Sequence, residues 1–255
     1  MLLKPIIIVT IAISGLISLI FRGEISSKGH FSLCVSTLTI SLVFTLLELN
    51  YNFSLNVYHY LDLGTFIKIN EVFESKFLFC FDSLSYICSA IVIVLTIIAQ
   101  LFGVEYMARE AHSIRLSYLL NLFASSVITL FSVYDVFLLF CVWELIAYLS
   151  YLLVSYYTHK IHITKSAFKV IYFSRISDIF IFLIFIFSVR IFGSTDMSLI
   201  FFKAPYFYNH NTIFLLCKFE KLDKYILMIV NSLTLIGFLV AMASFIKSAQ
   251  ICFHV

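Results

Sequence analysis

Residues 116–157 read "LSYLLNLFASSVITLFSVYDVFLLFCVWELIAYLSYLLVSYY", and this stretch decides the fold. It holds two apolar runs, Leu116 to Tyr134 and Val136 to Tyr157, with only the motif "SVYD" at their junction. About 20 apolar residues are enough for a helix to cross a bilayer. Because so short a connection allows only antiparallel neighbours, the stretch predicts a transmembrane helical hairpin.

The rest of the chain repeats this pattern. Of its 255 residues, 62% are hydrophobic and 12% are charged, whereas globular domains carry roughly 25% charged residues. Strand-like alternation is absent from the apolar runs, which favours a helical bundle over a barrel. The expected spans are Pro5 to Phe21, Phe31 to Leu49, Phe77 to Phe102, Leu116 to Tyr134, Val136 to Tyr157, Ser166 to Gly193 and Tyr225 to Lys247. We therefore expect an all-α membrane protein with about seven transmembrane helices.

The connections indicate the orientation in the membrane. With seven spans, the basic connections "FRGEISSKGH", "GVEYMAREAHSIR" and "YYTHKIHITKSAFK" all lie on one side. Basic residues in short loops favour the inner compartment, which places the N-terminus outside. The first residues, "MLLKPIII", run directly into the first span without the pattern of a transit peptide. The 29 Phe and 15 Tyr suit AT-rich codons and hence an organellar gene, although a lipid-facing surface explains them equally well.

Cysteine and histidine give no sign of a cofactor. The six cysteines form no CxxC pair and are interpreted as small packing residues. The histidines fall mostly in connections, not at the depth where axial haem ligands lie, which disfavours a b-type cytochrome. We therefore expect no cofactor and no metal ion bound by this chain, and no nucleic-acid partner.

Four ionisable residues lie inside the expected spans, away from their ends: Glu144, Arg175, Asp178 and Lys247. Insertion of such a residue at a helix centre costs about 2.5 to 3.5 kcal/mol. Each of the four therefore requires a partner, a hydrated cavity or a function.

Glu144 lies near the membrane middle, on a helical face that continues through Phe137, Cys141, Tyr148, Tyr151 and Ser155. Such a row of hydroxyl groups can hold water and relay protons. The alternative is a protonated glutamate that hydrogen-bonds between helices.

Arg175 and Asp178 are three residues apart, so they lie on one helix face and can pair. A structural ion pair and a functional one remain equally open for these two residues.

Lys247 lies in the polar context "NSLTLIGFLVAMASFIKSAQ", whose small and polar groups would satisfy the backbone at a helix interruption. A carboxylate about 7 Å from the amine would attract it by about 2.4 kcal/mol at an effective dielectric constant of about 20. Movement of that carboxylate would switch the lysine between holding and releasing a proton.

Seven short motifs, in order along the chain, resemble one family. They are "FDSLS" at 81–85, "YM" at 106–107, "RLSYLLNLF" at 115–123, "WE" at 143–144, "SYLL" at 150–153, "SRISD" at 174–178 and "KSAQ" at 247–250. This series resembles the antiporter-like subunits of respiratory complex I (NADH:ubiquinone oxidoreductase), and among them the subunit 5 family. The resemblance is specific over residues 81–255 and only general over residues 1–76.

The resemblance implies the N-terminal half of an antiporter-like inverted-repeat fold. Residues 1–76 would form two helices and a long outer-side loop, and residues 77–255 would form helices 3 to 7 with the first proton half-channel. Glu144 would pair with Lys247 on a discontinuous helix, and Arg175 with Asp178 would help to convey coupling. The chain would then act as part of NADH:ubiquinone reductase without carrying a redox centre itself.

The chain also departs from the family pattern. Family members carry a proline two residues after "KSAQ", where this chain has Cys252, so the ordinary cause of a helix break is missing. Family members also continue beyond this point into further spans. We therefore expect a second polypeptide to complete the subunit, with a truncated chain as the alternative.

These expectations define the partners and the rival functions. The expected partners are that second polypeptide, other membrane-arm subunits of complex I and the lipid bilayer, and the expected location is the mitochondrial inner membrane. One alternative is a subunit of a multisubunit cation/proton antiporter. Another is a structural membrane scaffold that has lost the proton path.

Overall fold

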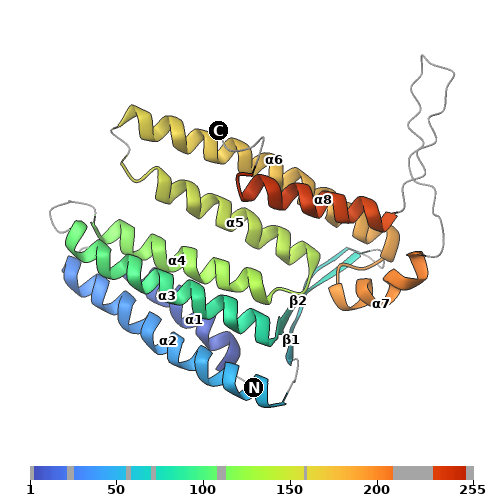
Figure 1. Cartoon of the computed structure of the whole chain (residues 1–255), viewed down its shortest axis with the longest axis horizontal. Helices are drawn as coiled ribbons and strands as arrows, with labels where there is room; N and C mark the ends of the chain where they lie inside the picture. Colours follow the sequence, from blue (N-terminus) through green and yellow to red (C-terminus); the bar gives the residue numbers. More distant parts are fainter. Residues whose placement is uncertain are drawn as a thin grey trace. The chain divides into compact units, whose positions relative to one another are not determined.

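The computed structural model describes residues 3–21, 26–55, 59–69, 73–107, 113–157, 160–208 and 232–250. Its elements are α1 (Leu3–Ile20), α2 (Ser27–Leu55), β1 (His59–Ile69), β2 (Phe73–Phe81), α3 (Ser83–Tyr106), α4 (Ser113–Ser132), α5 (Val136–Val154), α6 (Ile161–Phe192), α7 (Met197–Tyr208) and α8 (Ser232–Lys247) (Figure 1). The chain divides into two compact units. Unit 1 comprises 1–62, 78–133 and 141–171, and unit 2 comprises 63–77, 134–140 and 172–255.

The helices match the expected membrane spans. Helices α2 to α6 are long and apolar enough to cross a bilayer, whereas the apolar stretches Pro5–Ile20 in α1 and Leu233–Lys247 in α8 are shorter. Together they occupy the positions of the seven expected spans, although residues 225–231 of the last one lie outside the described residues. The prediction of an all-α membrane protein is confirmed.

Helix α3 shows how the side chains are sorted. Its buried face carries polar groups, among them Ser85, Ser89 and Gln100, while large apolar residues such as Leu95 and Phe102 are 60% and 69% exposed. A helix in water shows the reverse pattern, because exposed apolar area is unfavourable there. The sorting is that of a helix with lipid outside and interhelical contacts inside.

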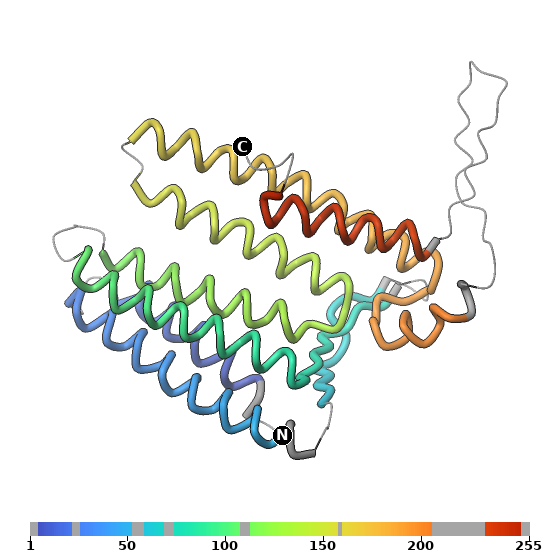
Figure 2. The backbone as a smooth tube through the Cα atoms, in the orientation of Figure 1, coloured from blue at the N-terminus to red at the C-terminus, as the bar shows by residue number. Residues whose placement is uncertain are grey.

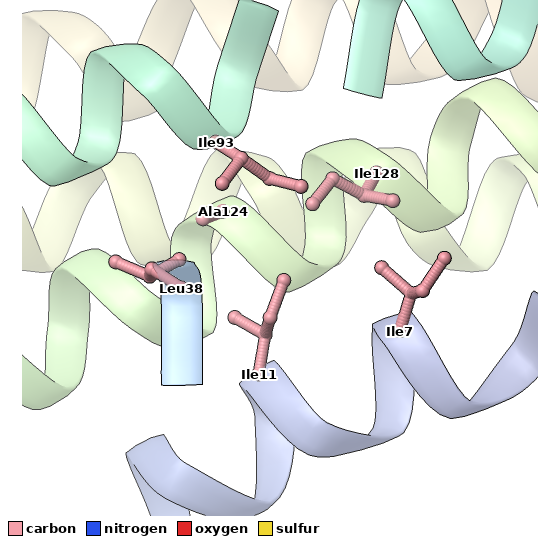
Figure 3. Close-up of a cluster of buried hydrophobic side chains, with 6 residues drawn as sticks. All are labelled: Ile7, Ile11, Leu38, Ile93, Ala124 and Ile128. Carbon is pink, nitrogen blue, oxygen red and sulfur yellow. The ribbon is translucent and has the colours of Figure 1, made fainter. Parts of the chain in front are cut away.

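Helices α1 to α4 pack side by side in unit 1. Their shared core is a cluster of aliphatic side chains that point towards one another (Figure 3). Its members are Ile7, Ile11, Leu38, Ile93, Ala124 and Ile128. In a bilayer these contacts contribute through dispersion, since lipid tails are as apolar as the side chains themselves.

A buried polar chain crosses the same bundle. Gln100 on α3 donates from Nε2 to the Ser117 carbonyl at 2.8 Å and to Asn121 Oδ1 at 3.0 Å. Asn121 on α4 then donates to Ser14 Oγ on α1 at 2.9 Å. Gln100 and Asn121 are fully buried. These bonds fix the register of three helices, because polar groups away from water need partners.

Helix α4 carries four small hydroxyl residues that bond within their own helix. Ser125, Ser126, Thr129 and Ser132 each donate to a carbonyl three residues earlier in their own helix. These residues are small, and the hydrogen-bonding capacity of each hydroxyl group is satisfied within its own helix. Gln100 and Asn121, which we did not single out from the sequence, form interhelical side-chain hydrogen bonds in this region.

The strands β1 and β2 form a two-stranded hairpin and correct the expected span boundary at Phe77. The apolar run at 77–81 is strand, and the helix begins only at Ser83. Asp82 decides this boundary, because its side chain accepts from the Ser85 amide at 2.8 Å while the Ser85 hydroxyl accepts from the Asp82 amide at 3.0 Å. Such a reciprocal cap satisfies two amides at a helix N-terminus.

In unit 2, α8 runs beside α6 in the opposite direction (Figure 2). Ser177 on α6 donates to the Ala243 carbonyl on α8 at 3.1 Å. Helix α6 ends before Gly193, whose φ of +70° suits a glycine after a helix C-terminus. Lys203 of α7 donates to the terminal Phe192 carbonyl at 2.6 Å, which holds α7 against the end of α6.

Candidate functional site

Glu144 lies in the middle of α5, one of the long apolar helices. Its side chain is half-buried. On the face that we expected to lead away from it, Ser155 is buried, Tyr151 is half-buried and Tyr148 is 54% exposed. The hydroxyl groups therefore differ widely in exposure, and a proton route along this face stays a prediction.

Arg175 and Asp178 form an ion pair on α6. Arg175 Nη1 lies 3.6 Å from Asp178 Oδ2, with the arginine side chain 53% exposed and the aspartate side chain 5% exposed. The expected i, i+3 pairing is thus present, and it joins a buried carboxylate to an outward-facing guanidinium. Removal of the arginine would leave the carboxylate to be compensated by other groups.

Lys247 is the last residue of α8, and the helix ends in a complete Schellman motif. The Gln250 amide donates to the Phe245 carbonyl and the Ala249 amide to the Ile246 carbonyl, both at 3.1 Å. Ala249 has a φ of +50°, in the left-handed region. The helix therefore ends at the lysine without a proline, through an alanine in a conformation that usually requires glycine.

Lys247 lies in the last turn of α8. Its side chain is half-buried and its Nζ is itself buried.

Asp178 and Lys247 both lie in unit 2. The Ser177–Ala243 hydrogen bond sets the register of α6 against α8, and Lys247 follows Ala243 by one helical turn. Side chains on antiparallel helices lean towards their own N-termini, so those of Asp178 and Lys247 lean towards the same level. Glu144 lies in unit 1. The predicted Glu144–Lys247 pair joins residues of two separately described units and stays a prediction.

One buried carboxylate was missed by the sequence analysis. Asp135, immediately before α5, is 1% exposed. Its Oδ1 accepts from the Phe137 and Leu138 amides at 2.9 and 3.1 Å. An aspartate just before an apolar helix is a known N-cap signal, and that signal could have identified it.

Two further segments meet Asp135. Ser75 on β2 donates to Oδ1 at 3.1 Å, and Thr195 donates to Oδ2 at 2.6 Å. Both side chains are fully buried. We call Asp135, Ser75, Thr195 and the first turn of α5 the Asp135 cluster, and all of it lies in unit 2.

Among the residues that the structure describes, no group of three histidine, cysteine or acidic side chains could hold a metal ion. Cys34, Cys80, Cys88 and Cys141 are free thiols. At Cys80 on β2, burial raises the pKa of the thiol, and the neighbouring Asp82 carboxylate raises it further.

The chain matches no family model. It is 29% identical over 246 residues to NADH-ubiquinone oxidoreductase chain 5 of Paramecium tetraurelia, covering 96% of this chain and 41% of that protein. It is 27% identical over 244 residues to the protein of the same name from Dictyostelium discoideum, covering 95% and 34%. For the Mycosarcoma maydis protein, identity is 28% over 224 residues, covering 87% and 29%. The chain thus spans less than half the length of these relatives, and over nearly all of its own length it is similar to proteins named NADH-ubiquinone oxidoreductase chain 5.

Proposed function

We propose that this chain is a proton-translocating membrane subunit of respiratory complex I. Protons would move through a relay that includes Glu144 and Lys247, driven by NADH:ubiquinone oxidoreduction elsewhere in the complex. The observation that carries the proposal is the match to chain 5 proteins over 96% of the chain. The helical membrane fold is compatible with it.

The local geometry supports the chemistry of such a relay. Lys247 places a buried amine in the last turn of α8. A carboxylate that approaches or withdraws would change the balance between the charged and neutral amine. Glu144 would supply that carboxylate, and Asp178, with Arg175, would adjust the local charge from α6.

The proposed location is the mitochondrial inner membrane, and the proposed partners are the other membrane-arm subunits. The second polypeptide that we expect to complete the subunit remains a prediction. Affinity purification of this chain from solubilised membranes tests these statements together. We expect flavin and iron–sulfur proteins in the eluate, NADH:ubiquinone reductase activity, and further chain 5 sequence identified by mass spectrometry.

The same purification separates the rival functions. A cation/proton antiporter subunit would elute without redox subunits and would show ion exchange driven by a sodium or potassium gradient. Neutralisation of Lys247 by Lys247→Met then tests the relay in the assembled complex, with Lys203→Met as a matched control. Loss of proton translocation for the Lys247 variant alone supports the relay, and unchanged translocation would show that the amine carries no protons.

A further inference from the structure

We infer that Asp135 is a positioning residue that sets the register of α5 and thereby the place of Glu144. The inference rests on the proposed function for the role of Glu144. Its structural basis is the Asp135 cluster, in which one buried carboxylate accepts hydrogen bonds from β2, from the turn before α7 and from the start of α5.

The bonding pattern of Asp135 is that of a fixed acceptor. Two donors are backbone amides of the first helical turn, and two are hydroxyl groups. Both carboxylate oxygens are used, and the residue is 1% exposed. An ionised carboxylate is an acceptor-only group, so this set of donors fits it without any proton transfer. Asp135 therefore suits a permanent attachment point better than a proton carrier.

Backbone bonds strengthen the attachment. The Val136 amide donates to the Thr195 carbonyl at 2.9 Å, and the Met197 amide donates to the Tyr134 carbonyl at 3.1 Å. These two bonds form an antiparallel bridge between Asp135 and Asp196. The segment before α7 thus lies across the start of α5 and holds its first residue by main chain and side chain together.

Aromatic contacts hold the same turn from other sides. Phe137 lies 6.1 Å from Phe66 of β1 and 5.3 Å from Phe185 of α6, measured between ring centroids. Phe140, one turn later, lies 5.7 Å from Phe182. Aromatic pairs at these distances attract beyond their area burial. Together with the hydrogen bonds of Asp135, these contacts oppose both a shift of the first turn of α5 along the helix axis and its rotation about that axis.

The register of this turn fixes Glu144. Glu144 lies nine positions after Asp135, which corresponds to about 13.5 Å along a helix. A slip by one residue would move the carboxylate by about 1.5 Å and rotate it by about 100°. Misplacement of a reacting group by about 1 Å can cost two orders of magnitude in rate. Loss of the cluster should therefore impair any reaction that depends on Glu144.

The test compares variants in the assembled complex in native membranes. Asp135→Ala removes all four hydrogen bonds of the carboxylate. Asp135→Asn keeps a side-chain oxygen that can accept from Ser75 and from the two helix amides. The bond to Thr195 is retained with its direction reversed, because the asparagine NH2 group donates to the Thr195 hydroxyl oxygen. Asp196→Ala is the matched control, since Asp196 is the neighbouring helix cap and accepts from the Ser198 amide of α7 at 2.8 Å.

Proton translocation is measured per NADH oxidised, per assembled complex, across a range of pH. We expect Asp135→Ala to lower the translocation ratio at least about threefold and to change its pH profile, Asp135→Asn to restore most of it, and Asp196→Ala to leave it unchanged. Thr195→Val keeps the side-chain shape but removes the hydroxyl donor, so it should also lower the translocation ratio. If Asp135→Ala fails to assemble, the ratio of Thr195→Val is the test of the inference.

A double variant tests whether Asp135 acts through Glu144. If it does, Asp135→Ala combined with Glu144→Gln should be no worse than Glu144→Gln alone. Additive losses, or an unchanged ratio and pH profile for Asp135→Ala and Thr195→Val, would overturn the inference. A normal ratio for Glu144→Gln alone would instead contradict the proposed function, so the two failures are distinguishable.

Discussion

Replacement of Asn121 by leucine should weaken the bundle of α1, α3 and α4 by a calculable amount. The change removes two interhelical hydrogen bonds, one accepted from Gln100 and one donated to Ser14. Such bonds between membrane helices contribute about 0.6 kcal/mol each on average. The Ser14 hydroxyl keeps the Ile11 carbonyl and one Gln100 N–H keeps the Ser117 carbonyl, whereas the second Gln100 N–H loses its acceptor inside the bundle.

The expected loss is therefore at least about 1.2 kcal/mol of unfolding free energy, or at least about sevenfold in the folding equilibrium. The assay is SDS-induced unfolding of the purified protein in detergent, followed by circular dichroism. Ser126→Ala is the matched control on the same helix, because Ser126 is buried but donates only to the Phe123 carbonyl of its own helix. We expect a change below about 0.5 kcal/mol for this control.

Either of two results would exclude a stabilising role for the interhelical bonds of Asn121. Asn121→Leu within about 0.3 kcal/mol of the unchanged protein would mean that the interhelical bonds contribute nothing. Equal losses for Asn121→Leu and Ser126→Ala would mean that bundle stability depends on side-chain volume on α4 and not on the polar chain.

Three further predictions follow from single positions. Ala249→Gly should stabilise the end of α8 by about 1 kcal/mol in the same unfolding assay, because φ at this residue is +50°; a loss would show that the turn is not left-handed. Cys80, as the sole cysteine in a variant, should react with maleimide at pH 8 more slowly than an unstructured thiol and accelerate as pH rises, since its thiol pKa is raised; an equal rate would contradict this. Gly15→Ala should destabilise the bundle, because its Cβ would lie 3.1 Å from Leu122 side-chain carbons, whereas Gly237→Ala meets nothing within 4 Å and should be neutral or stabilising; equal effects would exclude close packing at Gly15.

Hydropathy alone located most of the helices. The long spans of α3 to α6 can be predicted because bilayer thickness sets a minimum apolar length, and few other structures place 20 apolar residues together. The error at Phe77 has a clear cause. An apolar run of five residues has no period that separates strand from helix, and only the cap at Asp82 shows where the helix begins.

The polar contacts were less predictable. Gln100, Asn121 and Ser14 are far apart in sequence, so no local pattern could pair them. The end of α8 at Lys247 depends on a left-handed alanine, whereas the sequence analysis considered only a proline as the cause of a helix break. By contrast, the Arg175–Asp178 pair follows directly from helical spacing. The Glu144–Lys247 pair and the functional roles of all four residues stay predictions.

The most direct test of the proposed relay is the ratio of protons translocated to electrons transferred in complexes that carry Glu144→Gln. The ratio is measured during NADH oxidation by a ubiquinone analogue, with Glu105→Gln, a neutralised exposed carboxylate at the end of α3, as the control. We expect that Glu144→Gln assembles and oxidises NADH but translocates fewer protons per electron, while Glu105→Gln keeps the full ratio. A full ratio for Glu144→Gln would show that this carboxylate carries no protons.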